Sequence, residues 1–161
     1  MTRYTLFDSP LGPMRIASNG RAITAIGFPG QKHDIETQPD WQRNDEAAEL
    51  AAACRQLAEY FANKRRDFDL PLEAAGSPFQ QGVWRALARV GYGRTSTYGA
   101  LARALHRPAA ARAVGAAVGR NPIAIVVPCH RIIGADGSLT GYAGGLGRKT
   151  RLLALEGVLL A

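Results

Sequence analysis

Alternating apolar and polar positions predict that the chain begins with a small β-sheet. Residues 4–28 consist of short apolar runs separated by two turn signals, Ser-Pro-Leu-Gly at residues 9–12 and Ser-Asn-Gly at residues 18–20. Short strands divided by glycine-containing turns are typical of an antiparallel arrangement. Residues 29–41 are polar and are expected to be irregular.

The periodicity changes to that of a helix over residues 45–61. Apolar side chains recur there at spacings of four, three and four, which places them on one face of an amphipathic helix. The stripe is formed by Leu50, Cys54, Leu57 and Phe61. Because Cys54 lies on this stripe, we assign it to packing rather than to chemistry.

A second helix is predicted to start at Ser77, where the local sequence carries three start signals. Serine is a favoured N-cap, Pro78 suits the first helical position, and Gln80 is placed to close a capping box. The expected buried face consists of Phe79, Val83, Leu87 and Val90. Gly91 is expected to end the helix.

Two shorter helices are predicted next, and their spacing is typical of a helix-turn-helix. Ser96 or Thr97 is expected to cap a helix that runs to Leu105. Pro108 is expected to begin another helix over residues 109–119. Two short helices joined by a tight turn favour this motif.

The helix over residues 109–119 is composed almost entirely of small side chains. Val114 and Val118 are expected to face the core. The opposite side is then formed by Arg112, Ala113 and Ala116. Gly115 and Gly119 each cost about 1 kcal/mol relative to alanine inside a helix, which indicates that something approaches the backbone closely. Either a neighbouring helix or a nucleic-acid groove would satisfy this, and the basic surroundings favour nucleic acid.

A thiol beside an imidazole stands at the end of an apolar run. Residues 123–127 are continuously apolar and predict a buried strand, which Pro128 ends because proline cannot continue a strand's hydrogen-bond ladder. We therefore expect Cys129 at a turn on the edge of a pocket. A cysteine is a strong nucleophile as thiolate, and nearby partners, for which His130 and Arg131 are candidates, lower its pKa. The alternative is a buried cysteine that only packs.

The last part of the chain combines a glycine-rich loop with a helix. Residues 135–138 are expected to form a hairpin tip. Residues 141–147 depart from the phosphate-binding P-loop pattern, because Arg148 interrupts the required glycine-lysine pair. A final helix is predicted over residues 149–156. Its last residue, Glu156, is either a surface carboxylate or the partner of an internal cation.

Composition narrows the function classes. The 161 residues, 47% of them hydrophobic, suit one domain or two small ones. Two cysteines are too few for a disulfide framework, and no basic-then-apolar leader opens the sequence. No apolar stretch approaches the roughly 20 residues that span a bilayer. We therefore expect a cytoplasmic protein without a membrane role.

The net charge of +7 is distributed unevenly along the chain. Residues 1–75 carry 9 Lys+Arg and 11 Asp+Glu, whereas residues 76–161 carry 11 Lys+Arg and only 2 Asp+Glu. Seventeen of the twenty cations are arginine, whose planar guanidinium suits phosphates and base edges. The second half is therefore predicted to bind nucleic acid.

Several of these motifs together resemble the O6-alkylguanine-DNA alkyltransferase family. They are Pro128-Cys129-His130-Arg131, Asn121-Pro122, Gly141-Tyr142-Ala143-Gly144-Gly145, Leu155-Glu156-Gly157 and Arg112, preceded by Phe79-Gln80-Gln81-Gly82-Val83-Trp84 and Thr97-Tyr98-Gly99. The resemblance extends across the second half of the chain, while the first half matches only in layout.

The resemblance implies an α+β (α/β two-domain) fold. Residues 1–75 would form a ribonuclease H-like domain with a small antiparallel sheet and a helix, and residues 76–161 a mostly helical, winged helix-turn-helix-like DNA-binding domain that carries the alkyl acceptor. The implied function is direct DNA repair, in which an alkyl group moves irreversibly and in a single turnover from O6-alkylguanine or O4-alkylthymine in duplex DNA to Cys129. We expect a monomer, with cooperative binding on DNA left open, and no cofactor or metal.

The same resemblance implies roles for individual residues. Cys129 would be the nucleophile, His130 would accept its proton through water, and Glu156 would orient the imidazole. Tyr98 would donate a proton or hydrogen bond to the purine, and Asn121 would brace the cysteine turn.

DNA contacts and a substrate pocket are implied as well. Arg112 resembles the family's arginine finger, which fills the place of a flipped nucleotide. The other DNA-binding positions are Ala113, Ala116, Tyr98 and Arg131. The pocket would be formed by Val127, Tyr142, Ala143 and Gly144.

Two other function classes remain open. One is a non-catalytic DNA-binding module in which Cys129 merely packs, and the other is a cysteine hydrolase that uses Cys129, His130 and Glu156. The chain also departs from the family at two points. Members often have serine where Ala143 stands, which matters little if only the backbone amide is used. Some members bind zinc in the first domain, but no Cys/His cluster precedes Cys129.

Overall fold

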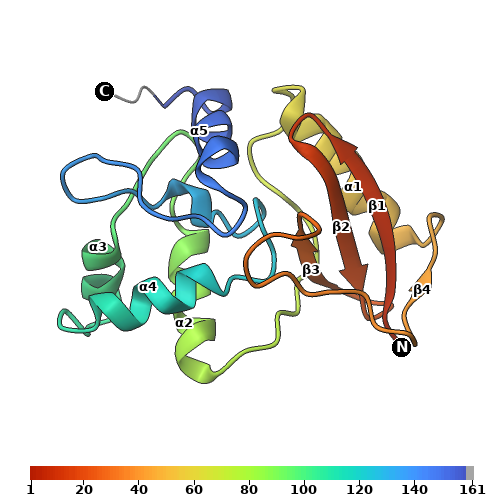
Figure 1. Cartoon of the computed structure of the whole chain (residues 1–161), viewed down its shortest axis with the longest axis horizontal. Coiled ribbons are helices and arrows are strands. Elements are labelled where there is room, and N and C mark those ends of the chain that lie inside the picture. Colours follow the sequence, from red (N-terminus) through yellow and green to blue (C-terminus); the bar gives the residue numbers. More distant parts are fainter. Residues whose placement is uncertain (159–161) are drawn as a thin grey trace. The chain divides into compact units, whose positions relative to one another are not determined.

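Two compact units make up the computed structural model, which describes residues 1–158. Unit 1 comprises residues 1–75 together with residues 122–124, and unit 2 comprises residues 76–121 and 125–158. Figure 1 shows the order of the elements along the chain. No helix in this described part of the chain is long and apolar enough to cross a membrane.

Unit 1 is built on a four-stranded sheet in the order β3-β2-β1-β4 (Figure 1). β1 (Arg3–Ser9) and β3 (Ile23–Gly27) both pair antiparallel with the central β2 (Gly12–Ser18), which confirms the predicted antiparallel sheet. Gly12 adopts φ 111°, a left-handed conformation that glycine reaches without steric cost. The edge strand β4 (Gln42–Arg43), parallel to β1, was not predicted because two exposed polar residues give no alternating pattern.

Helix α1 (Ala48–Phe61) packs against this sheet. It begins three residues later than the predicted start at residue 45. The Asp45 carboxylate accepts hydrogen bonds from Thr5 Oγ1 at 2.7 Å and Arg43 Nε at 2.9 Å, which holds it in the preceding segment. The buried face is also rotated from the predicted stripe, so that Cys54 and Phe61 are only half-buried. It consists of Leu50, Ala53, Gln56, Leu57 and Tyr60.

Unit 2 contains three packed helices, α2 (Pro78–Ala88), α3 (Tyr98–Ala104) and α4 (Ala111–Gly119), with α4 in contact with both others. The predicted start of α2 is confirmed, because Ser77 and Gln80 form both hydrogen bonds of a capping box. Of the two candidate caps of α3, Thr97 accepts the hydrogen bond, from the backbone N–H of Ala100.

The buried face of α2 differs from its prediction. Val83 and Leu87 are buried as expected, but Phe79 and Val90 are only half-buried. Trp84 takes their place, and its indole Nε1 donates to the Ala117 carbonyl of α4 at 2.9 Å. A buried indole needs such a partner for its N–H.

Four further features of unit 2 and the segment before Cys129 differ from the sequence-based expectations. Helix α4 begins at Ala111 rather than residue 109, because Pro108 lies in the preceding turn. Residues 123–127 are not a strand: Ile123 forms a single parallel bridge with Ile26 of unit 1, and the chain then turns. Helix α5 (Leu146–Leu155) begins three residues before the predicted start, inside the glycine-rich loop. Residues 135–138 form a tight turn, closed by the Gly134 N–H and Ser138 carbonyl at 2.7 Å, without flanking strands.

Candidate active site

Cys129 begins a single 3-10 turn, η1 (Cys129–Arg131). The approach to this turn is tightly constrained. Ile125 adopts φ 71°, a left-handed conformation that is costly for a β-branched residue and persists only when its surroundings enforce it. The Val127 carbonyl accepts hydrogen bonds from Asn121 Nδ2 at 2.8 Å and from the Cys129 N–H at 2.9 Å. Asn121 therefore fixes the backbone immediately ahead of the thiol.

The Cys129 side chain is buried, and the residue is 8% exposed. Burial raises the pKa of Cys129, and this effect outweighs the Asn121 side-chain hydrogen bond, the charge of Lys149 and the local backbone N–H groups, all of which lower that pKa. The sequence-based expectation that His130 and Arg131 lower the pKa of Cys129 is therefore wrong: its pKa is raised. At neutral pH the thiol is protonated, so its reaction as a nucleophile requires a base.

A buried imidazole–carboxylate pair lies next to the thiol in sequence. His130 Nε2 is 2.7 Å from Glu156 Oε2, and both side chains are 0% exposed. Within residues 1–158, His130 Nδ1 has no hydrogen-bond partner. Burial lowers the pKa of His130, with Glu156 opposing the shift. The geometry therefore favours a neutral imidazole that carries its proton on Nε2 and offers the Nδ1 lone pair as a proton acceptor.

Arg131 has a different role from the predicted DNA contact. It is buried, and its guanidinium pairs with Glu156 through Nε–Oε1 at 2.8 Å and Nη2–Oε2 at 3.1 Å. Its Nη1 also donates to the Val90 carbonyl at 2.6 Å. An arginine in a basic sequence suggests a phosphate contact, but the Glu156 carboxylate binds it inside the protein. Glu156 is thus the partner of an internal cation, one of the two alternatives considered above.

Lys149 belongs to the same site, although no pattern in the sequence predicted a role for it. The residue is completely buried in α5, and its Nζ donates to the carbonyl oxygens of Ile132 and Thr140. Burial lowers the pKa of Lys149 to about 8, while the nearby Cys129 opposes this shift. One sequence signal could have revealed it: Lys149 stands three and four residues before Leu152 and Leu153, which places it on the apolar face of the helix.

The predicted pocket residues lie in two segments. Val127 is buried, and Gly144 is buried with its carbonyl accepting from Arg148 at 3.0 Å. The hydroxyl of Tyr142 is buried without a hydrogen-bond partner among residues 1–158, and burial together with the neighbouring Cys129 raises its pKa well above the ordinary value. Tyr142 and Cys129 therefore lie in one electrostatic environment. Ala143 is half-buried.

The surface of α4 has the predicted division of side chains. Val114, Ala117 and Val118 are buried, while Arg112, Ala113 and Ala116 are exposed. At Gly115 the close approach comes from a neighbouring helix, since an added Cβ would lie 3.7 Å from the ring of the half-buried Tyr98 in α3. At Gly119 an added Cβ would meet nothing within 4 Å.

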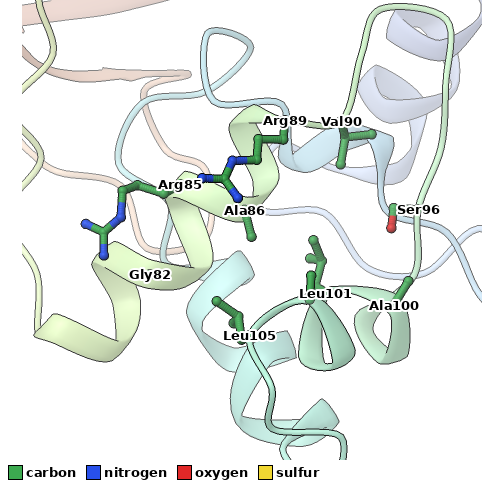
Figure 2. A pocket seen from close by; sticks show the side chains of 10 residues that line it. Gly82, Arg85, Ala86, Arg89, Val90, Ser96, Ala100, Leu101 and Leu105 are labelled. Atoms are coloured by element: carbon green, nitrogen blue, oxygen red, sulfur yellow. The ribbon is translucent and has the colours of Figure 1, made fainter.

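A separate groove of about 290 Å³ lies between α2 and α3. Figure 2 shows Arg85 of α2 and Arg89, which directly follows α2, beside an apolar lining that includes Ala86, Leu101 and Leu105. None of the predicted site residues lines it. This groove is therefore distinct from the cysteine site.

Together these features define a class of protein: an α+β protein whose helical unit 2 carries a cysteine next in sequence to a buried histidine–glutamate pair. Residues 2–74 match the family model "6-O-methylguanine DNA methyltransferase, ribonuclease-like domain". Residues 78–158 match "6-O-methylguanine DNA methyltransferase, DNA binding domain". The chain belongs to the 6-O-methylguanine DNA methyltransferase family, and both the predicted family and the predicted α+β fold class are confirmed.

Individual relatives agree with this assignment over nearly the full chain. A methylated-DNA–protein-cysteine methyltransferase of Methanosarcina acetivorans is 47% identical over 96% of this chain and 97% of its own length. A protein of the same name from Haemophilus influenzae is 44% identical over 95% of this chain and 85% of its own. The crystal structure of Mycobacterium tuberculosis OGT in complex with DNA has a TM-score of 0.89 and 45% identity, covering 96% of this chain and 92% of that one.

Proposed function

We propose that this chain is a methylated-DNA–protein-cysteine methyltransferase that repairs DNA directly, with Cys129 as the alkyl acceptor. The names of its relatives and the DNA complex of the Mycobacterium tuberculosis relative support this activity. The observation that carries the proposal is the buried His130–Glu156 pair, which leaves His130 Nδ1 available to a proton from the thiol that precedes it in the same turn.

In the proposed reaction, the Cys129 thiol gives its proton to His130 Nδ1 through a water molecule, and Glu156 stabilises the resulting imidazolium. The sulfur attacks the alkyl carbon of O6-alkylguanine. A carbon–sulfur bond forms, the carbon–O6 bond breaks, and its electron pair passes to guanine. Tyr98 donates a hydrogen bond to the purine ring, and the proton lost by the thiol ends on guanine. The thioether is stable, so each molecule reacts once. The reaction uses no cofactor or metal.

The substrate oxygen lies inside stacked duplex, so the nucleotide must flip out at a cost of a few kcal/mol. Arg112 is exposed on α4 and would fill the vacated place in the stack, while Ala113 and Ala116 let the helix approach the minor groove. Other arginines of residues 76–161 would bind phosphates without reading sequence. Val127, Tyr142, Ala143 and Gly144 would line the pocket for O6-alkylguanine or O4-alkylthymine.

We further propose a division of labour between the two parts of the chain. Residues 1–75 would form the ribonuclease H-like domain, and residues 76–161 would bind DNA and accept the alkyl group. The protein would act as a monomer, with cooperative binding along DNA left open. A DNA substrate and two free cysteines fit the reducing conditions of the cytoplasm.

Intact-protein mass after incubation with an O6-methylguanine duplex tests the proposal. We expect one added methyl group per molecule, located on Cys129 by peptide mapping. Cys129→Ser should gain no mass yet retain DNA binding, and Cys54→Ser, as the matched control, should react like wild type. Unmodified Cys129 in wild type, or repair by Cys129→Ser, would overturn the proposal. Turnover of an activated ester beyond one equivalent would favour a cysteine hydrolase instead.

A further inference from the structure

Lys149 is an unusual residue in its setting. It is the only lysine in residues 76–161, which hold ten arginines, and it is 0% exposed. Lysine is rarely buried completely unless it is paired, because removing an ammonium from water costs several kcal/mol. A buried lysine in a basic part of the sequence therefore requires an explanation.

The ammonium is satisfied entirely by neutral oxygens. Its Nζ donates to the Ile132 carbonyl, to the Thr140 carbonyl at 3.3 Å and to Thr140 Oγ1 at 3.2 Å. Three acceptors match the three N–H groups of an ammonium. Within residues 1–158 no carboxylate forms an ion pair with Lys149, so hydrogen bonds satisfy its N–H groups while its charge has no anionic partner.

These acceptors belong to the two segments that carry the proposed chemistry. Ile132 directly follows the η1 turn that holds Cys129, and Thr140 precedes the pocket residue Tyr142 by two positions. Thr140 Oγ1 also lies within 3.5 Å of the Ile132 carbonyl, so the two segments meet at the lysine. One side chain of α5 thus ties the nucleophile turn to the pocket segment.

The positive charge of Lys149 also acts on the Cys129 thiol. Lys149 interacts electrostatically with Cys129 and His130 of η1. His130 also interacts with the Arg131–Glu156 pair, and Cys129 with Tyr142 of the loop, which in turn interacts with Arg148. Arg131 is paired with Glu156, which leaves Lys149 as the cation whose charge lowers the pKa of Cys129. Arginine would carry the same charge, but its planar fork does not reproduce three converging ammonium bonds.

We propose that Lys149 is a positioning residue of the alkyl-transfer site, where its ammonium joins the Cys129 turn to the Tyr142 segment and its positive charge favours the ionised sulfur. This inference rests on the proposed function. It goes beyond the Cys129–His130–Glu156 arrangement because it gives α5 a second link to the nucleophile.

The electrostatic part can be tested without DNA. The rate at which iodoacetamide modifies Cys129 is followed by peptide mass across neutral and alkaline pH for wild type, Lys149→Met and Arg151→Met. Arg151 is an exposed cation of the same helix and provides the matched control. The midpoint of the rate–pH curve should rise by about one pH unit in Lys149→Met, and the modification rate below that midpoint should fall about tenfold. The rates of Arg151→Met should stay within about twofold of wild type.

An unchanged midpoint in Lys149→Met would overturn the electrostatic part. If Lys149→Met does not unfold cooperatively, Lys149→Gln replaces it, because the amide can still donate to the carbonyls without a charge. The same upward shift is then expected, and its absence would overturn the idea equally. A structural role alone would change unfolding but not the midpoint of the folded protein.

The link between the segments is tested by Thr140→Ala, which removes one acceptor and keeps the lysine charge. Methyl transfer from an O6-methylguanine duplex should slow about tenfold, with the iodoacetamide midpoint unchanged. Thr150→Ala removes an exposed α5 hydroxyl that donates to the Leu146 carbonyl, and this variant should transfer at the wild-type rate. A wild-type rate in Thr140→Ala would refute the link. If wild type itself transfers no methyl group, the proposed function fails while the iodoacetamide result still decides the electrostatic part.

Discussion

Arg131 and Glu156 form a two-point ion pair inside unit 2, and the same carboxylate is hydrogen-bonded to His130 Nε2. Glu156 also lies 3.4 Å from the backbone N–H of Gly93. One residue at the end of α5 therefore balances a buried cation and orients the imidazole beside Cys129. The integrity of the interior and the orientation of the base depend on the same side chain.

Glu156→Gln should therefore destabilise unit 2 strongly, because glutamine keeps the volume but leaves the Arg131 charge buried and uncompensated. We expect the free energy of unfolding in urea to fall by about 3–5 kcal/mol. Glu73→Gln is the control, since Glu73 pairs with Arg21 at the surface and such pairs contribute about 1 kcal/mol or less. Equal losses in the two variants would contradict the burial argument.

Local signals predicted the starts of two helices well. The side chains that cap α2 and α3 act on backbone groups three residues away, so Ser77, Gln80 and Thr97 could be interpreted without knowledge of the rest of the fold. The antiparallel sheet followed in the same way from alternation and turn residues, whereas the α+β class came from the family resemblance.

Features that depend on distant partners could not be predicted from local patterns. The apolar run at residues 123–127 is compatible with a strand, and only its surroundings impose the left-handed Ile125. Arg131 could not be separated from the surface arginines before the position of Glu156 was known. Lys149 was missed because its acceptors are backbone and hydroxyl oxygens of other segments, which leave no mark on the sequence near it.

The rate of methyl transfer should depend on pH through His130. The base must be neutral to accept the thiol proton, and burial lowers the pKa of His130 below its ordinary value of 6.5. The acid-side loss of rate should therefore have its midpoint below pH 6.5. Single-turnover transfer rates measured against pH, with folding monitored at each point, check this.

The lowered pKa of His130 also makes the stability of the protein depend on pH. Below pH 6.5 the unfolded state binds a proton at this histidine more readily than the folded state does, so the free energy of unfolding should fall as the pH falls through this range. A loss of transfer centred above pH 6.5 in fully folded protein would exclude His130 as the base.

Arg112→Ala should discriminate between duplex and free base. If Arg112 occupies the place of the flipped nucleotide, its removal should slow repair of an O6-methylguanine duplex by about tenfold or more, whereas reaction with free O6-methylguanine should stay within about twofold. Arg120→Ala is the control, because Arg120 is exposed at the end of α4 and would lose only phosphate attraction. Equal slowing of both substrates by Arg112→Ala would exclude the finger role.

Two glycines of unit 2 should respond to alanine with opposite signs. At Gly76 the new Cβ would lie 2.5 Å from the Trp84 ring, which is buried and held by its hydrogen bond to Ala117, so the ring cannot move aside freely. We expect Gly76→Ala to lower the free energy of unfolding by about 1–3 kcal/mol.

At Gly115 the Cβ would make an ordinary 3.7 Å contact with the Tyr98 ring, and alanine is favoured over glycine inside a helix by up to about 1 kcal/mol. Urea unfolding should therefore show a gain for Gly115→Ala, and a loss at both positions would mean that α3 and α4 pack more tightly than this geometry indicates.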